Sequence, residues 1–146
     1  MQRADIPSFA AADGRAQVNL ISGPWDGHAG PIASLTDVQM ATVTLAPGAR
    51  LEVPVAAGRS VFLYVVRGEI AVGGTVAPAF HLVELNGDGD TVALQAMREA
   101  VLLFGHAPPL AEPVVSHGPF VMNTRAEIVQ AVRDYQAGMF GDVPVG

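Results

Sequence analysis

The sequence contains no cysteine, which excludes disulfide bonds, thiolate catalysis and zinc sites built on cysteine. It also contains no lysine. All eight basic residues are arginines scattered singly along the 146-residue chain, and 14 acidic residues bring the net charge to −6. Nucleic-acid binding needs a basic stripe that displaces counterions from phosphates. Because no such stripe is present, direct binding of DNA or RNA is not expected.

Long apolar runs are also absent. Runs such as residues 61–66 are far shorter than the about 20 residues that a membrane helix needs. The first 13 residues are polar and interrupted by Pro7, unlike a secretory signal peptide. These absences predict a cytoplasmic protein that does not associate with a membrane.

Charge itself is scarce. Charged residues make up 15% of the chain, against about 25% in typical soluble domains. The mean hydropathy is +0.35. One interpretation is an apolar surface that another protein surface covers. The other is a β-barrel rich in alanine and valine with a large core, and the composition leaves both open.

The apolar pattern predicts many short strands separated by Gly and Pro. Segments of this kind recur about every 8–12 residues, which is typical of a sandwich or barrel and not of βαβ units. The candidate strands are residues 17–22, 32–35, 38–46, 51–55, 60–67, 70–72, 80–85, 91–95 and 99–104.

The last segment changes period and predicts a helix. Thr124 and Glu127 match a capping box, in which each side chain satisfies an amide of the first turn. Gly138 is suited to end the helix in a left-handed conformation. Between these signals, apolar residues recur at three- and four-residue spacing on one stripe: Ile128, Ala131, Val132 and Tyr135.

Two stretches carry a family resemblance. Residues 45–73 resemble the first half of a cupin barrel, and residues 110–141 resemble the C-terminal signature of pirins. Over residues 5–141 the chain is therefore similar to the C-terminal cupin domain of the pirin family, within the RmlC-like cupin superfamily. The signature residues are Glu112, Pro113, His117, Gly118, Pro119, Phe120, Met122, Asn123 and Thr124.

The resemblance implies an all-β fold, a cupin double-stranded β-helix (jelly-roll barrel) with one C-terminal α-helix. It implies a single cupin domain over residues 1–146 with its core at about 5–141. Pirins in general have two cupin domains, of which the N-terminal one binds an iron-type metal. Some members are associated with quercetin 2,3-dioxygenase activity or with transcriptional regulation. This chain resembles only the second domain, and it is either a truncated protein or a natural single-domain relative.

The metal positions of the cupin pattern lack ligands in this sequence. Cupin chemistry requires about three imidazoles and a carboxylate that converge inside the barrel. Counting back from Gly68, the two positions of the His-x-His motif fall on Pro54 and Ala56. A further histidine is expected near residues 91–95, which contain none. We therefore predict no metal site, no cofactor and no catalytic residue.

The four histidines do not replace those ligands. His28 lies in a loop rich in Gly and Pro and is expected to be exposed. His106 follows a strand and is expected at the rim of the barrel. His117 belongs to the signature and is a candidate to bind the turn before the helix. The alternation along residues 81–85 points His81 inward, where a structural role outweighs a metal role.

Three functions remain open. The first is a non-catalytic cupin module, structural or partner-binding, that forms a homodimer or pairs with an N-terminal cupin domain. The second is a cupin dioxygenase of the quercetin 2,3-dioxygenase type. The third is a metal-free barrel that binds an unidentified small molecule, with these candidate lining residues: Leu51, Val53, Phe62, Tyr64, His81, Val92 and Leu94.

Overall fold

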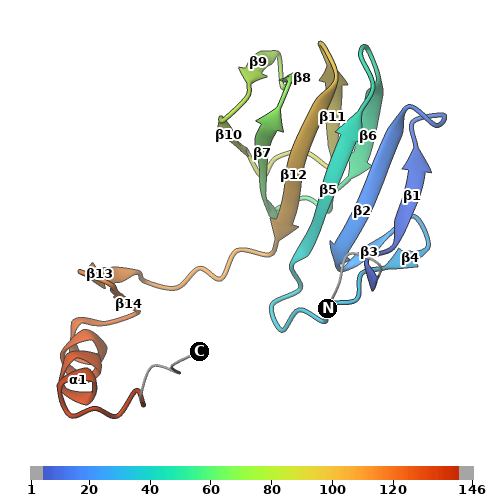
Figure 1. Cartoon of the computed structure of the whole chain (residues 1–146). Helices are drawn as coiled ribbons and strands as arrows, with labels where there is room; N and C mark the ends of the chain where they lie inside the picture. Colours follow the sequence, from blue (N-terminus) through green and yellow to red (C-terminus); the bar gives the residue numbers. More distant parts are fainter. Residues whose placement is uncertain (1–4, 142–146) are drawn as a thin grey trace. The chain divides into compact units, whose positions relative to one another are not determined.

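The computed structural model describes residues 5–141, which contain fourteen strands and one helix (Figure 1). They form two compact units, one ending at Pro109 and one beginning at Leu110. The strands of the first unit are β1 (Ser8–Ala11), β2 (Ala16–Ser22), β3 (Pro24–Trp25), β4 (His28–Ala29), β5 (Gln39–Leu45), β6 (Arg50–Pro54), β7 (Ser60–Arg67), β8 (Glu69–Val72), β9 (Thr75–Pro78), β10 (Leu82–Leu85), β11 (Thr91–Ala96) and β12 (Ala100–Ala107). The second unit holds β13 (Val115–His117), β14 (Phe120–Met122) and α1 (Arg125–Gln136).

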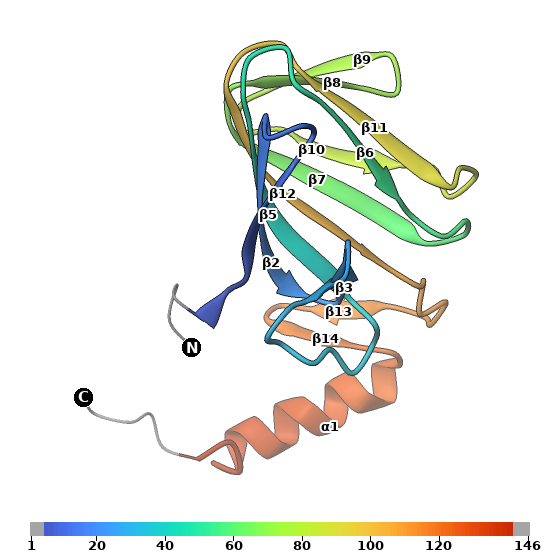
Figure 2. The same cartoon turned by 90° about the vertical axis from the view of Figure 1, so that its right-hand side faces the viewer.

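The first unit is built from two antiparallel sheets that enclose the core (Figure 2). One sheet has six strands in the order β1-β2-β5-β12-β7-β10, and the other has four in the order β6-β11-β8-β9. Side chains alternate between the two faces of each strand, so every second residue is buried. Along β5 and β6 the buried positions alternate strictly with less buried ones. The predicted all-β cupin fold with one helix is confirmed.

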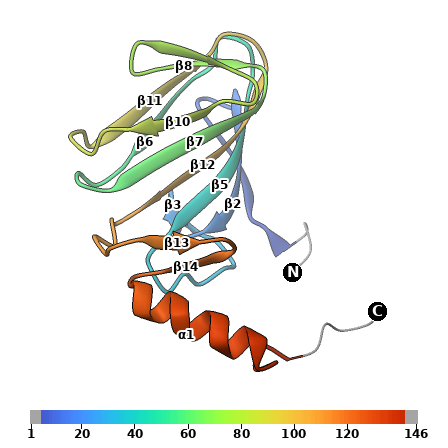
Figure 3. The same ribbon diagram turned by 90° about the vertical axis from the view of Figure 1, so that its left-hand side faces the viewer.

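The second unit is a short hairpin packed against a helix (Figure 3). Strands β13 and β14 pair antiparallel, and α1 contacts both. The capping box is confirmed: Thr124 Oγ1 accepts from the backbone N of Glu127 at 3.2 Å, and Glu127 Oε2 accepts from the N of Thr124 at 2.8 Å. After α1, Gly138 has a φ of +73°, the left-handed value predicted for the end of the helix. Ile128 and Ala131 are the buried residues of α1.

The sequence predicts one domain over residues 1–146, whereas the described residues separate into two units. Residues 1–4 and 142–146 of the predicted domain lie outside the described range. Within that range, no helix is long and apolar enough to span a lipid bilayer.

The predicted strand at residues 32–35 is wrong. This segment makes only an isolated bridge between Ile32 and Ser22. The hydroxyl of Ser34 competes with strand pairing. Its Oγ accepts a hydrogen bond from the backbone N of Val38 at 2.9 Å and so closes a local turn. Strands β1, β3, β4, β9, β13 and β14 were not predicted, since each has only two to four residues.

Candidate functional site

The interior positions of β6 differ by one residue from those predicted for metal ligands. Pro54 and Ala56 are exposed, whereas Val53 and Val55 are 1% and 5% exposed and face the core. Because side chains alternate, a count that is off by one residue moves a position to the opposite face of the sheet. The predicted positions are wrong, but the positions that do face inward also carry alkyl side chains.

These residues do not fit an iron-type centre. Valine has no lone pair to give to a metal, and the neighbouring interior positions of β7 are Val61, Leu63 and Val65. Within residues 5–141, no group of three or more His, Cys, Asp or Glu side chains is arranged to hold a metal ion. The interior of the first unit therefore offers an apolar wall and no coordination sphere.

Phe62 and Tyr64 were predicted to line the barrel, and this is wrong. Both are half-buried on the outer face of the six-stranded sheet, because they alternate with the buried residues of β7. The ring of Phe62 packs over Gly105 of β12: a Cβ added there would lie 2.7 Å from Cε1 of Phe62. The contact explains why β12 has a glycine at this point.

Four other predicted lining residues do lie inside the barrel. Val92 of β11 pairs with Val53 of β6, and Leu94 pairs with Leu51. All four are buried in the core cluster. Val92 lines a cavity described below, and Leu94 borders a separate pocket beside β8, whereas Leu51 and Val53 pack in the core between the sheets. Their predicted role in binding stays a prediction.

His81 was predicted to point inward but is exposed. Its Nδ1 lies 3.1 Å from the carbonyl oxygen of Ala79. Strand β10 begins only at Leu82, and Phe80 adopts a φ of +66°, so the alternation of β10 does not extend back to residue 81. A ligand role inside the barrel is therefore excluded for this side chain.

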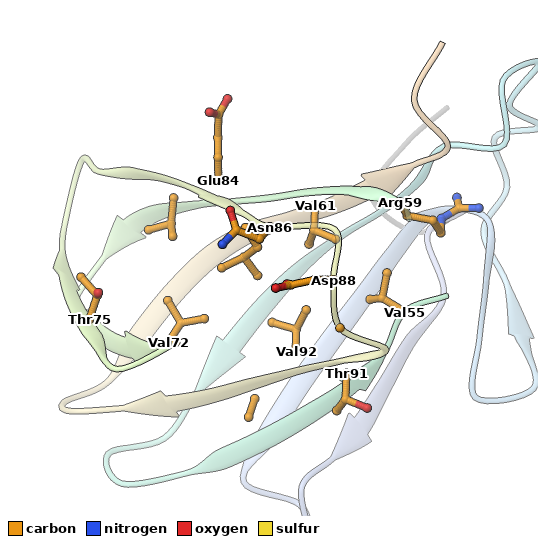
Figure 4. A pocket seen from close by; sticks show the side chains of 15 residues that line it. Val55, Arg59, Val61, Val72, Thr75, Glu84, Asn86, Asp88, Thr91 and Val92 are labelled. Carbon is orange, nitrogen blue, oxygen red and sulfur yellow. The ribbon is translucent and has the colours of Figure 1, made fainter. Parts of the chain in front are cut away.

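A cavity of about 530 Å³ is lined by residues of β7, β8, β9, β10 and β11 and of the loops that follow β6 and β10 (Figure 4). Its apolar wall consists of short aliphatic side chains: Val55, Val61, Val72, Val83, Leu85 and Val92. Its polar lining comes from Arg59, Thr75, Glu84, Asn86, Asp88 and Thr91. Sequence reasoning identified only Val92, although the clustering of valines on these strands was a usable signal for an incompletely filled interior.

His106, which was predicted at the rim of the barrel, lies at the end of β12 and is buried, with 7% exposure. Nε of Arg59 donates to its Nδ1 at 2.7 Å. Burial lowers the pKa of His106, and the positive charge of Arg59 lowers it further, while Asp37 has a smaller opposite effect. Since Nδ1 accepts a hydrogen bond, the proton of the neutral ring is on Nε2, which is buried without a partner among residues 5–141.

Arg59 also holds Asp37. Its NH1 lies 2.6 Å from Oδ2 of Asp37, and its NH2 donates to the carbonyl oxygen of the same residue at 2.6 Å. The hydrogen bond from Arg59 and its charge lower the pKa of Asp37. The cation is thus used to tie the loop before β5 to the end of β12, and its charge is compensated.

The remaining histidines are exposed. His28 was predicted to be exposed, which is confirmed, and its ring stacks on Phe9 with centroids 4.1 Å apart. His117 lies in the hairpin of the second unit, paired with Phe120. The turn before α1 is closed by other side chains: Asn123 Nδ2 donates to Glu112 Oε2 at 3.0 Å and to the Pro113 carbonyl at 2.9 Å.

The signature residues assemble the second unit. Gly118, with a φ of +55°, and Pro119 form the turn between β13 and β14, and Met122 pairs with Val115. The ring of Phe120 packs edge-on against Tyr135 and Phe140, with centroids 6.3 and 6.4 Å apart. Together with the Glu112–Asn123 hydrogen bond, these contacts give the signature a structural explanation.

Comparison with known families decides the identity of the fold. The family model of the pirin C-terminal cupin domain matches residues 40–141. The chain belongs to this family. A pirin-like protein of Caulobacter vibrioides is 40% identical over 132 residues, covering 89% of this chain and 48% of the relative. Human pirin is 34% identical over 126 residues, covering 82% of this chain and 43% of pirin.

A solved structure has the same architecture. The quercetin 2,3-dioxygenase of Acinetobacter baumannii superposes with a TM-score of 0.91 at 27% identity, covering 99% of this chain and 50% of that chain. This pirin-family chain therefore spans about half the length of the relatives it matches. The family match includes the cavity residues from Val55 to Ala93 and all of the signature.

Proposed function

We propose that this pirin C-terminal cupin domain is a non-catalytic module that acts by binding another cupin domain. The observation that carries the proposal is the aliphatic interior around β6 and β7, where Val53, Val55 and Val61 face the core and offer no atom that could ligate a metal. Without a bound transition metal, oxygen activation of the cupin type has no centre to act on.

An apolar outer surface supports a partner role. Leu82 of the edge strand β10 pairs with Tyr64, and Leu103 of β12 pairs with the same tyrosine on its other side. Paired residues share a face of the sheet. With Phe62 next to Tyr64 on that face, these four residues form what we term the outer patch. Leu82 is 58% exposed. Apolar surface of this kind marks interaction sites.

The proposed occupant of the outer patch is a second cupin barrel. In the absence of a separate N-terminal cupin domain, a second copy of this chain fills that role and gives a homodimer. Relatives about twice the length of this chain support a two-barrel arrangement. A stable interface of this type should bury at least about 1,000 Å² in total.

Dioxygenase activity is the alternative, suggested by the name of the Acinetobacter baumannii structure. The side chains of the interior do not favour it. The two functions are separated by measuring the metal content and quercetin consumption of protein purified without an affinity tag, beside a cupin that has an intact His-x-His motif as positive control. We expect less than about a tenth of a metal ion per chain and no turnover. Stoichiometric iron, nickel or copper with quercetin consumption would overturn the proposal.

A further inference from the structure

The cavity of about 530 Å³ described above exists because the short valine side chains that line it do not fill the space between the strands. Val55, Val61, Val72 and Val92 keep 5–7% exposure, whereas Leu63 and Val65, deeper in the same core, have 0%. The four valines therefore border space that solvent reaches. A volume of about 530 Å³ falls within the range of small-molecule sites, and an apolar wall with a few polar groups is their usual composition.

The charge that the cavity presents is negative. Figure 4 shows the side chain of Asp88 directed into the cavity, toward Val61 and Val92, whereas Glu84 points away from it. Within residues 5–141, Asp88 takes part in no ion pair. The cation of the lining, Arg59, is compensated by Asp37 at 2.6 Å, and Figure 4 shows its guanidinium turned away from the cavity.

The loop that carries Asp88 is held in place by backbone hydrogen bonds. The N of Gly58 donates to the carbonyl of Gly87 at 2.9 Å, and the N of Val55 donates to the carbonyl of Asp90 at 2.9 Å. These bonds anchor the loop on both sides of Asp88. A loop backbone that is fixed before binding loses little conformational freedom when a ligand arrives, although the Asp88 side chain itself is exposed.

We propose that this cavity binds a small organic cation, a protonated primary amine with a short apolar body. The ammonium group donates charge-assisted hydrogen bonds to the Asp88 carboxylate, which are stronger than bonds between neutral groups. The apolar body packs against Val61, Val72 and Val92. The site does not depend on the non-catalytic role of the domain, and metal content does not bear on it.

Three aromatic probes of similar size test the charge that the cavity selects. Benzylamine is protonated at pH 7, benzyl alcohol is neutral and benzoate is an anion. Calorimetric or NMR titration of the full chain should show binding of benzylamine, at least about fivefold weaker binding of benzyl alcohol and none of benzoate. Equal affinities for benzylamine and benzyl alcohol, or tighter binding of benzoate, would overturn the proposal.

Two matched variants test the position. Asp88→Asn keeps the size of the side chain and should weaken benzylamine binding about tenfold. Asp90→Asn removes the same charge from the same loop at a residue that does not line the cavity, and its affinity should equal that of the wild type. Equal losses in both variants would mean that the charge acts non-specifically, which contradicts the proposal.

A substitution that fills the cavity and a titration with a metal ion complete the test. Val92→Phe should abolish binding of benzylamine while thermal melting shows that the domain still folds; if it does not fold, the Asp88→Asn comparison decides alone. Calcium chloride is titrated in parallel. Binding of calcium with no binding of benzylamine would identify an inorganic cation site and overturn the proposal.

Discussion

Arg59 donates from Nε to Nδ1 of His106 at 2.7 Å, across 47 residues of sequence. The bond joins the loop after β6 to the end of β12, and the same guanidinium holds Asp37. A cation that donates to the imidazole makes protonation of His106 unfavourable, and burial acts in the same direction on its pKa. The folded first unit therefore favours the neutral form of His106.

We predict that stability falls on mild acidification. The pKa of His106 is lowered in the folded state from an ordinary value of 6.5. Below pH 6.5 the unfolded chain therefore binds a proton that the folded chain resists, and the free energy of unfolding decreases until the pH passes the folded pKa. Above pH 6.5 His106 is neutral in both the folded and the unfolded chain, so its protonation no longer lowers the free energy of unfolding. Urea melts from pH 8 to pH 5 measure this slope.

The groups that face His106 set the size of that slope. Arg59 opposes protonation and Asp37 favours it. Asp37 itself has a pKa below 3.8 in the folded state, so its contribution is lost only at pH values under about 4. His106→Gln should flatten the profile between pH 7 and pH 5, whereas His117→Gln, at an exposed position, should leave it unchanged. An unchanged slope in His106→Gln would contradict the assignment.

Removing the donor of this pair should destabilise the first unit. Arg59→Met keeps the length of the side chain but leaves buried Nδ1 of His106 without a partner, which costs about 1–3 kcal/mol of unfolding free energy. The matched control is Arg67→Met, because Arg67 pairs with Glu99 at 2.6 Å with both side chains exposed. That change should stay within about 0.5 kcal/mol. Equal losses of unfolding free energy in the two variants, measured by chemical denaturation, would show that the buried hydrogen bond contributes no more than the exposed ion pair.

Gly105 should not tolerate a methyl group. In Gly105→Ala the new Cβ would lie 2.7 Å from the ring of Phe62, and displacing this half-buried ring costs about 1–3 kcal/mol. Gly87→Ala is the control, because the nearest atom to its added Cβ is 3.6 Å away. Thermal or urea melts compare the two. Adding Phe62→Leu should restore most of the loss; if it restores none, the contact with the ring is not the cause.

The outer patch should mediate self-association. Leu82→Lys places a charge on an apolar surface next to Tyr64, and burying an unpaired charge in an interface is unfavourable. We expect a dimer for the wild type and a monomer for the variant in analytical ultracentrifugation at micromolar concentration. Val76→Lys, at a residue of β9 that is also exposed, should remain dimeric. A monomeric wild type would show that a second copy of this chain does not occupy the outer patch.

The sequence predicted the parts of the fold that depend on local signals. The capping box of Thr124 and Glu127 defines the start of α1 because both partners lie within one turn. The fold class followed from the spacing of strands and from the pirin resemblance. Strand 32–35 failed because the hydroxyl of Ser34 forms a turn that apolar content does not reveal.

The candidate site was harder to predict, because it depends on which face of a strand is buried. The run from Ser60 to Arg67 is apolar on both faces, so periodicity alone could not decide between Phe62 and Leu63 as interior residues. Counting back from Gly68 gave Pro54, one residue away from the interior, although residues 50–55 alternate clearly and place Val53 on the buried face. The burial of His106 depends on Arg59, which is distant in sequence, and no local pattern could have revealed it.

The central claim is that aliphatic side chains replace the metal ligands inside this barrel, and titration of the metal-free chain with nickel(II) or anaerobic iron(II) tests it most directly. We predict only weak binding through exposed histidines, with no one-to-one site tighter than about 1 μM. The affinity of the Val53→Ala variant for either metal ion should equal that of the wild type. One-to-one binding with a dissociation constant well below that value, retained when His28, His81 and His117 are replaced, would contradict the account.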